Sequence, residues 1–215
     1  MKGRVTAMTL FEFDNTYRDR YKFICGVDEA GRGPLAGDVY AAAVIFPEGV
    51  VIDGLNDSKK LTEKQREKLF DEIKEKALAW CIASSTVEEI ERINILEAAK
   101  LAMQRAVAGL KVSPDIILID GNMPPKFDTD SEAIVKGDGT SQAIAAASVL
   151  AKVARDRYMK ELAVKYPEWQ FDRHKGYGTK LHYQMIDQFG ESPVHRHSFL
   201  KKYYAKKAKQ DAQQA

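Results

Sequence analysis

The chain has 215 residues, of which 45% are hydrophobic and 30% are charged. This composition excludes disordered, collagen-like and coiled-coil proteins, and the length suits one large domain with its own core. No apolar run approaches the roughly 18–20 residues of a membrane span, and Glu12 and Asp14 interrupt the apolar residues near the start, so we expect a cytoplasmic protein without membrane contact. Cys25 and Cys81 form no C-x-x-C pair and are expected to be buried free thiols.

The net charge of +2 conceals an uneven distribution along the chain. Residues 1–151 carry 19 Lys and Arg against 24 Asp and Glu, whereas residues 152–209 carry 14 against 6. A basic C-terminal third indicates a polyanionic partner. A solvated, lysine-rich helix surface would give the same count, so charge alone leaves both interpretations open.

Short apolar runs alternate with amphipathic segments along the chain. Thr62 and Gln65 have the spacing of a capping box, and Asn94 can cap a further helix. The predicted elements are two strands (23–27 and 39–46), a helix (62–78), a strand (80–87), a helix (94–110), two strands (116–119 and 133–135) and two helices (140–165 and 180–189). This order predicts an α/β fold with a mixed central sheet of about five strands, flanked by helices and followed by a helical C-terminal part.

Four acidic residues follow or end predicted strands. Asp28 and Glu29 come after the first strand, Asp120 after the fourth, and Asp138 lies between the fifth strand and a helix. Neighbouring strands at least partly parallel would bring these acids to one edge of the sheet, where α/β proteins bind ligands. Such a cluster needs cations or must share protons. Oxygen donors without His or Cys favour two Mg²⁺ or Mn²⁺ ions, the arrangement that cleaves phosphodiesters. Each aspartate alone is equally typical of a turn or cap.

A glycine-rich loop follows the first two acids. The run from Gly31 to Gly37 has its third glycine one position late for a dinucleotide-binding motif, and a predicted strand follows it, so we reject that function. The glycines are better explained if backbone must approach a ligand beside Asp28 and Glu29.

Several motifs together resemble bacterial ribonuclease H type 2 (ribonuclease HII). They cover about residues 23–199 and are CGVDEAGRGPLAG (25–37), NDSKKL (56–61), ILIDG (117–121), KGD (136–138) with IAAASVLAKV (144–153), and HKGYGT (174–179). The resemblance implies a ribonuclease H-like fold and an endonuclease that uses two divalent metal ions. That enzyme would cut RNA in RNA/DNA hybrids and nick 5′ to a ribonucleotide embedded in duplex DNA, leaving 3′-hydroxyl and 5′-phosphate ends.

The resemblance also assigns residues. Asp28, Glu29, Asp120 and Asp138 match the catalytic, metal-binding acids, and Tyr177 matches a tyrosine that senses the junction between ribose and deoxyribose. The glycine-arginine-glycine motif for substrate binding falls on Gly31, Arg32 and Gly33. Candidate phosphate contacts, each of which can equally be an ordinary surface or packing residue, are Lys59, Ser148, Lys152 and Lys175.

The C-terminal end is predicted to be separate from the catalytic part. We expect a catalytic domain over 1–194 and a basic helical tail over 195–215. His195 and His197 can form a metal-binding H-x-H pair but are expected to be surface histidines. The tail has no clear Gln-plus-aromatic motif for a sliding clamp, so a clamp contact is not readable from the sequence. We expect a monomer.

Two other functions remain open at this point. One is a nuclease for another DNA structure, such as a resolvase or transposase, and the other is a nucleic-acid-binding protein without catalytic activity. Gly31-Arg32-Gly33 and Tyr177 argue against the first, and the four intact acids argue against the second.

Overall fold

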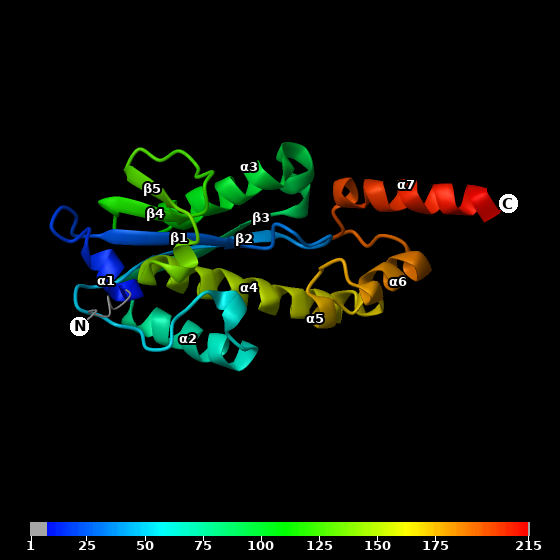
Figure 1. Ribbon diagram of the computed structural model, residues 1–215. Helices are drawn as coiled ribbons and strands as arrows, with labels where there is room; N and C mark the ends of the chain where they lie inside the picture. Colours follow the sequence, from blue (N-terminus) through cyan, green and yellow to red (C-terminus); the bar gives the residue numbers. More distant parts are fainter. Residues whose placement is uncertain (1–7, 215) are drawn as a thin grey trace, which may run out of the picture.

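The computed structural model describes residues 8–214, and a five-stranded mixed sheet lies at its centre (Figure 1). The strands are β1 (Ile24–Ala30), β2 (Val39–Ile45), β3 (Ala79–Ser85), β4 (Ile116–Asp120) and β5 (Asp130–Ile134). They lie in the order β3-β2-β1-β4-β5. β2 pairs antiparallel with β1 and β3, whereas β4 pairs parallel with β1 and β5. The predicted mixed sheet is therefore confirmed.

Helices cover both faces of this sheet and continue beyond its end (Figure 1). They are α1 (Leu10–Asn15), α2 (Glu63–Lys76), α3 (Val87–Ala108), α4 (Gln142–Lys165), α5 (Phe171–His174), α6 (Lys180–Phe189) and α7 (His197–Gln214). α3 lies on one face, and α4 lies on the other with α2 beyond it (Figure 1). In the described part of the chain, no helix combines the length and the apolar character needed to cross a membrane.

The alternation of side chains along the strands explains the two packed layers. In β2, Ala42 and Val44 belong to the core on the α4 side, while Ala43 belongs to the core on the α3 side. Gly26 of β1 faces α4, and a Cβ there would lie 2.0 Å from the backbone carbonyl carbon of Ala143. The small residues of β1, β2 and α4 therefore let helix and sheet pack closely, which brings the start of α4 to β1.

Helix α3 begins earlier than the sequence indicated. Thr86 caps it in a capping box with Glu89, upstream of the helix predicted from Asn94. At Asn94 the backbone adopts φ 68° and ψ 165°, and Asn94 Oδ1 accepts a hydrogen bond from the Leu96 N–H at 3.0 Å. Asn94 therefore kinks α3 and caps its second segment, which is the helix predicted from 94 onward.

Two further expectations need correction. β5 covers Asp130–Ile134 rather than 133–135, because its parallel pairing with β4, not its apolar content, sets its length. Cys25 is buried as expected, but Cys81 is only partly buried because β3 is an edge strand.

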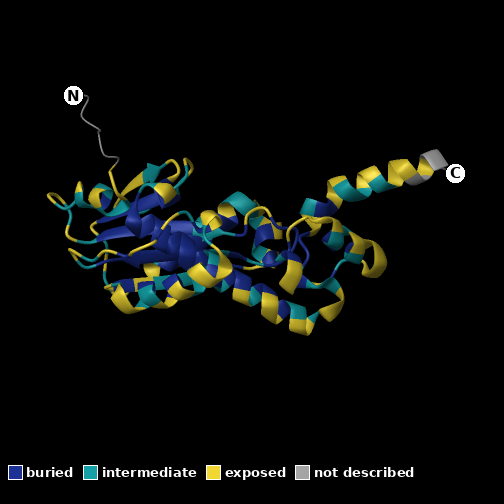
Figure 2. Cartoon of the chain, turned by 60° about the horizontal axis from the view of Figure 1, so that its bottom comes forward, coloured by how far each residue is buried: buried dark blue, intermediate teal, exposed yellow. Residues whose placement is uncertain are grey.

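The C-terminal part is helical, as predicted, and extends beyond the end of the sheet (Figure 1). α7 projects from the body, and most of its surface is exposed (Figure 2). Leu200 at its start packs with Leu35 and Ile186. Tyr203 stacks on Tyr183 of α6 and donates a hydrogen bond to Asp187. The division into 1–194 and 195–215 stays a prediction, and residues 1–7 and 215 of these two parts lie outside the described residues.

Candidate active site

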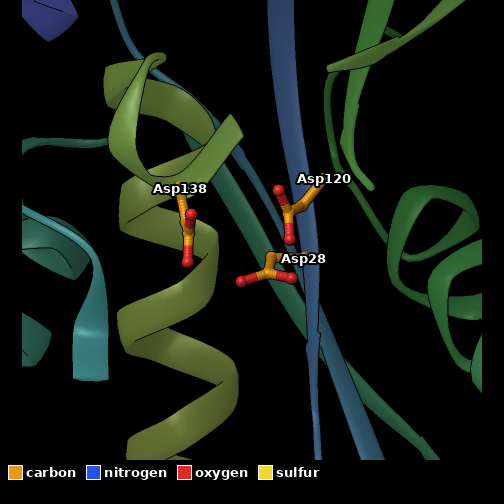
Figure 3. A group of neighbouring side chains, drawn as sticks. All are labelled: Asp28, Asp120 and Asp138. Carbon is orange, nitrogen blue, oxygen red and sulfur yellow. The ribbon is translucent and has the colours of Figure 1, made fainter. Parts of the chain in front are cut away.

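Three of the predicted acids meet at one edge of the sheet. β1 and β4 are paired in register up to Val27 and Ile119, and Asp28 and Asp120 are the next residue on each strand. Equivalent residues on neighbouring strands point to the same face, so these side chains lie side by side. Asp138 lies in a 3₁₀ turn immediately before α4. One carboxylate oxygen from each of the three lies within 4.8 Å of the others, and Figure 3 shows the carboxylates gathered together.

Glu29 reaches the same cleft from the other face of β1. It follows Asp28 in the strand, so its side chain lies on the α3 side of the sheet. Its Oε1 accepts a hydrogen bond from Arg32 Nη1 at 3.2 Å. Glu29, Asp28 and Asp120 line a cleft of about 210 Å³, although Glu29 is not a member of the group of three aspartates.

The electrostatics of the cluster are unfavourable without a cation. Burial raises the pKa of Asp28 well above its usual value, and the charges of Glu29 and Asp120 raise it further. Burial and the neighbouring Asp120 also raise the pKa of Asp138, against the lowering effect of Lys59. Burial raises the pKa of Glu29, which Arg32 partly offsets. Acids whose charged forms are disfavoured in this way are well placed to be neutralised by bound metal ions.

Hydrogen bonds fix the positions of the acids. Asp120 Oδ1 accepts from the Gly137 N–H at 2.7 Å, which ties the end of β4 to the turn that carries Asp138. Asp28 Oδ1 accepts from the Glu29 N–H at 2.7 Å. Lys59 Nζ lies 3.3 Å from Asp138 Oδ2. The carboxylate oxygens form a set of hard donors of the kind that Mg²⁺ and Mn²⁺ prefer, so the residues present fit such ions.

The glycine-rich loop and Tyr177 lie beside the acids. Gly31, Arg32 and Tyr177 line the cleft together with three of the acids, Asp28, Glu29 and Asp120. A Cβ on Gly33 would lie 3.9 Å from Tyr177 Cε1, so Gly33 and the tyrosine ring are neighbours, and 43% of Tyr177 is exposed. The fold therefore brings together motifs that are almost 150 positions apart in the sequence.

The candidate phosphate contacts divide into two groups. Lys59, Ser148 and Lys152 line the cleft. Ser148 is buried and its Oγ shares a hydrogen bond of 2.9 Å with Ser58 Oγ, while Lys152 Nζ pairs with Asp156 at 2.7 Å. Lys175 is not among the residues that line the cleft, and its Nζ donates to the carbonyl oxygen of Asp172.

Two buried arginines support the cleft and were missed by sequence reasoning. Arg155 and Arg196 are 1% and 0% exposed, and both donate to backbone carbonyls of the loop from Gly31 to Asp38. Arginine is usually a surface residue, and nothing in the sequence around these two distinguishes them from other cations.

The expectation for His195 was wrong. His195 is 4% exposed, and it lies in a buried cluster with His182 and Phe171. The sequence pattern of this segment is polar, and only the packing of α5 and α6 around it creates an interior. His197 is exposed as expected, with its Nδ1 3.1 Å from Glu191.

Comparisons with known proteins agree with this geometry. A family model described as Ribonuclease HII matches residues 25–202. The ribonuclease HII of Dechloromonas aromatica is 58% identical over 176 residues, which cover 82% of this chain and 90% of that protein. The ribonuclease HII of Vibrio campbellii is 55% identical over 183 residues, covering 85% and 86%.

Solved structures show the same fold. The crystal structure of ribonuclease H2 from Pyrococcus horikoshii matches with a TM-score of 0.69 at 28% identity, covering 82% of this chain and 93% of that chain. A ribonuclease HIII described as in complex with Mn²⁺ matches with a TM-score of 0.60 at 17% identity, covering 81% and 66%. The ribonuclease H-like fold expected from the sequence is thereby confirmed. With a family match over most of its length, this chain belongs to the ribonuclease HII family, divalent-metal-dependent endonucleases that hydrolyse RNA paired with DNA.

Proposed function

We propose that the enzyme cuts on the 5′ side of a ribonucleotide embedded in duplex DNA, as well as within RNA/DNA hybrids, and leaves 3′-hydroxyl and 5′-phosphate ends. The observation that carries this proposal is a single cleft lined by Asp28, Glu29 and Asp120 and also by Gly31 and Tyr177. The acids suit hydrolysis of any phosphodiester. The loop and the tyrosine add a surface that can recognise the sugar next to that phosphodiester.

Asp28, Glu29, Asp120 and Asp138 are the proposed catalytic residues and the ligands of two divalent ions. Both Mg²⁺ and Mn²⁺ suit their oxygen donors, and the ribonuclease HIII related in fold is described with Mn²⁺. When bound, such ions activate water at neutral pH and neutralise charge on the leaving oxygen. Asp120 and Asp138 would hold their places through the hydrogen bond between Asp120 and the Gly137 N–H.

The proposed ribose reader is the backbone from Gly31 to Gly33. The 2′-hydroxyl is the group that distinguishes RNA from DNA at one site, and it can both donate and accept hydrogen bonds. Without side chains at Gly31 and Gly33, backbone N–H and C=O groups can approach it closely. Tyr177, next to Gly33 and partly exposed, would stack on the following deoxyribose or its base.

Arg32, Lys59, Ser148, Lys152 and Lys175 are proposed contacts to the substrate backbone. Lys59 is the strongest of these because its side chain is 78% exposed, so its ammonium group can reach a phosphate as well as Asp138. Lys175 is the weakest because it lies outside the lining of the cleft. We propose that the enzyme acts as a monomer in the cytoplasm.

One set of rates tests the function. Duplexes with either one ribonucleotide or one deoxyribonucleotide at the cleavage position are incubated with wild type and with the Tyr177→Ala variant in single-turnover assays, with and without Mg²⁺. We expect Tyr177→Ala to lower cleavage beside the ribonucleotide about tenfold or more through lost stacking. We also expect removal of the 2′-hydroxyl to slow wild type far more than the variant.

Other outcomes point to the alternatives. Equal discrimination by both enzymes would show that Tyr177 does not contribute to ribose recognition. Efficient cleavage of the all-DNA duplex would favour a nuclease for another DNA structure. Binding without any metal-dependent cleavage would leave a nucleic-acid-binding protein.

A further inference from the structure

The loop that carries Tyr177 is attached to the glycine-rich loop by direct backbone contact. The Leu35 N–H donates to the Gly176 carbonyl at 2.8 Å. A Cβ on Gly176 would lie 2.6 Å from the Ala36 carbonyl oxygen, so no other residue type fits this approach. Lys175 and Gly176 both have positive φ, 50° and 81°. Two successive residues in this region form a tight bend that needs other contacts to hold it.

A buried pair of histidines lies behind this bend. His182, on α6, is 0% exposed, and its Nδ1 lies 3.0 Å from the Tyr177 carbonyl oxygen. Its Nε2 lies 3.0 Å from Nε2 of His195. Nδ1 of His195 accepts a hydrogen bond from the Ser192 N–H at 2.8 Å. The chain of contacts therefore runs from Ser192 through both rings to the backbone of Tyr177.

The partners at the two ends determine where the protons lie. A backbone N–H can only donate, so Nδ1 of His195 is an acceptor and its proton is on Nε2. That Nε2–H then donates to Nε2 of His182, which leaves the second proton on Nδ1 of His182. A backbone carbonyl can only accept, so Nδ1–H of His182 donates to Tyr177. Each ring nitrogen of the pair is used in this direction, and neither ring has a lone pair left for a metal ion.

We propose that His182 is a positioning residue for Tyr177, with His195 fixing the tautomer that His182 needs. His182 would set the place of the Tyr177 backbone, and through it the angle at which the ring meets the substrate next to Gly33. His174 stacks on His182 with ring centroids 4.1 Å apart and accepts from the Gly176 N–H at 3.2 Å, which holds the same bend from its other side. This inference rests on the proposed role of Tyr177.

Two substitutions of His182 separate positioning from packing. Asn places an amide N–H near the position of Nδ1, so His182→Asn can still donate to the Tyr177 carbonyl. Gln extends its amide toward the position of Nε2, so His182→Gln keeps the contact to His195 and loses the one to Tyr177. The measured quantity is the ratio of single-turnover rates on a duplex with one ribonucleotide and on an all-RNA/DNA hybrid. Thermal melts show that each variant is folded.

We expect His182→Gln to lower this ratio about three- to tenfold, the size of one lost hydrogen bond, and His182→Asn to keep more of it. If His182 only fills space, Gln should be tolerated better than Asn because its volume is closer to that of His. Both variants should then lower the melting temperature without changing the ratio. An unchanged ratio in His182→Gln, or a lower ratio in His182→Asn than in His182→Gln, overturns the inference. His182→Phe removes both polar contacts, so it should lower the ratio at least as much as His182→Gln does.

The Tyr177→Ala variant keeps this result distinct from failure of the proposed function. If Tyr177→Ala leaves the ratio unchanged, the proposed role of Tyr177 is wrong, and the inference about His182 fails with it. If Tyr177→Ala lowers the ratio and His182→Gln does not, the inference alone fails. The double variant should show no further loss of the ratio beyond Tyr177→Ala, because His182 acts through Tyr177.

Discussion

Gly31 lies directly against the guanidinium of Arg155, so closely that a Cβ on Gly31 would come within 2.1 Å of Arg155 Nε. The φ angle of Gly31 is +104°, which side-chain-bearing residues rarely adopt. Arg155 Nη2 donates to Ala36 and Nη1 to Lys175, each at 3.0 Å. The glycine is thus required by the protein's own packing, before any substrate approaches, because a buried arginine joins the two loops at this point.

Gly31→Ala should therefore disturb the loop as well as the chemistry. The strained backbone alone costs about 1–3 kcal/mol of folding free energy, and displacement of Arg155 adds to it. We expect a lower free energy of unfolding in denaturant titrations and a loss of cleavage of about a hundredfold or more. Gly33→Ala is the matched control for stability alone, since its Cβ meets nothing closer than 3.9 Å. A wild-type stability for Gly31→Ala would contradict this account.

Asp120→Asn should abolish cleavage and leave the fold intact. The asparagine can still accept from the Gly137 N–H, but the site loses one of its proposed charged ligands, and we expect activity to fall about a thousandfold or more. Without metal, this variant should melt at the same or a higher temperature than wild type, because Asp120 raises the pKa of Asp28 and Asp138. The second measurement is the melting temperature with and without Mn²⁺. Addition of Mn²⁺ should raise the melting temperature of wild type markedly and that of the variant little. Near wild-type turnover would exclude Asp120 from the site.

The buried histidine pair should make the protein less stable in mild acid. Burial, and then the neighbouring His174, lower the pKa of His182 from 6.5 to about 3, and burial lowers the pKa of His195 to about 4, against the raising effect of Glu191. Below pH 6.5 the unfolded chain binds protons that the folded chain does not, so stability falls as the pH falls, by up to about 1.4 kcal/mol per pH unit for each histidine.

The comparison with His182→Gln isolates this effect from the carboxylates. Asp14 has a pKa raised to about 6, mainly by burial, and it makes the folded state relatively more stable as the pH falls. Denaturant titrations between pH 7 and pH 5 should give wild type a steeper loss of stability than His182→Gln. Parallel curves for the two proteins would mean that His182 titrates normally in the folded state.

The exposed lysines of α7 provide a test of the basic C-terminal third. If α7 contacts the duplex, replacing Lys201, Lys202 and Lys206 by Gln should reduce the slope of log affinity against log salt concentration, by about 0.9 for each lost phosphate contact. The substitutions leave Leu200 and the packing of α7 in place. A second triple variant, in which Lys64, Lys68 and Lys111 are replaced by Gln, controls for the change in net charge. An unchanged slope in the α7 variant means that its charge serves solubility.

Local patterns were sufficient for most of the architecture. The strand predicted over 116–119 and the helix predicted over 140–165 came from signals within short windows, and both are present as β4 and α4. The boundary of β5 could not be obtained in this way, because Asp130 and Ser131 join the sheet only through pairing with β4. The beginning of α3 was present in the sequence as the capping box of Thr86 and Glu89 and was overlooked.

By itself, the sequence determined which acids and which loop belong together, because motif order and residue type at Asp28, Asp120 and Asp138 restrict the chemistry. Tertiary structure decided how they are held. Glu29 lies on the opposite face of β1 from Asp28, His195 is interior, and Arg155 and Arg196 are buried among backbone carbonyls. Burial of a polar side chain depends on which distant segments cover it and offer hydrogen bonds. For the two arginines, that information lies in contacts with residues more than a hundred positions away, and no local window of the sequence contains it.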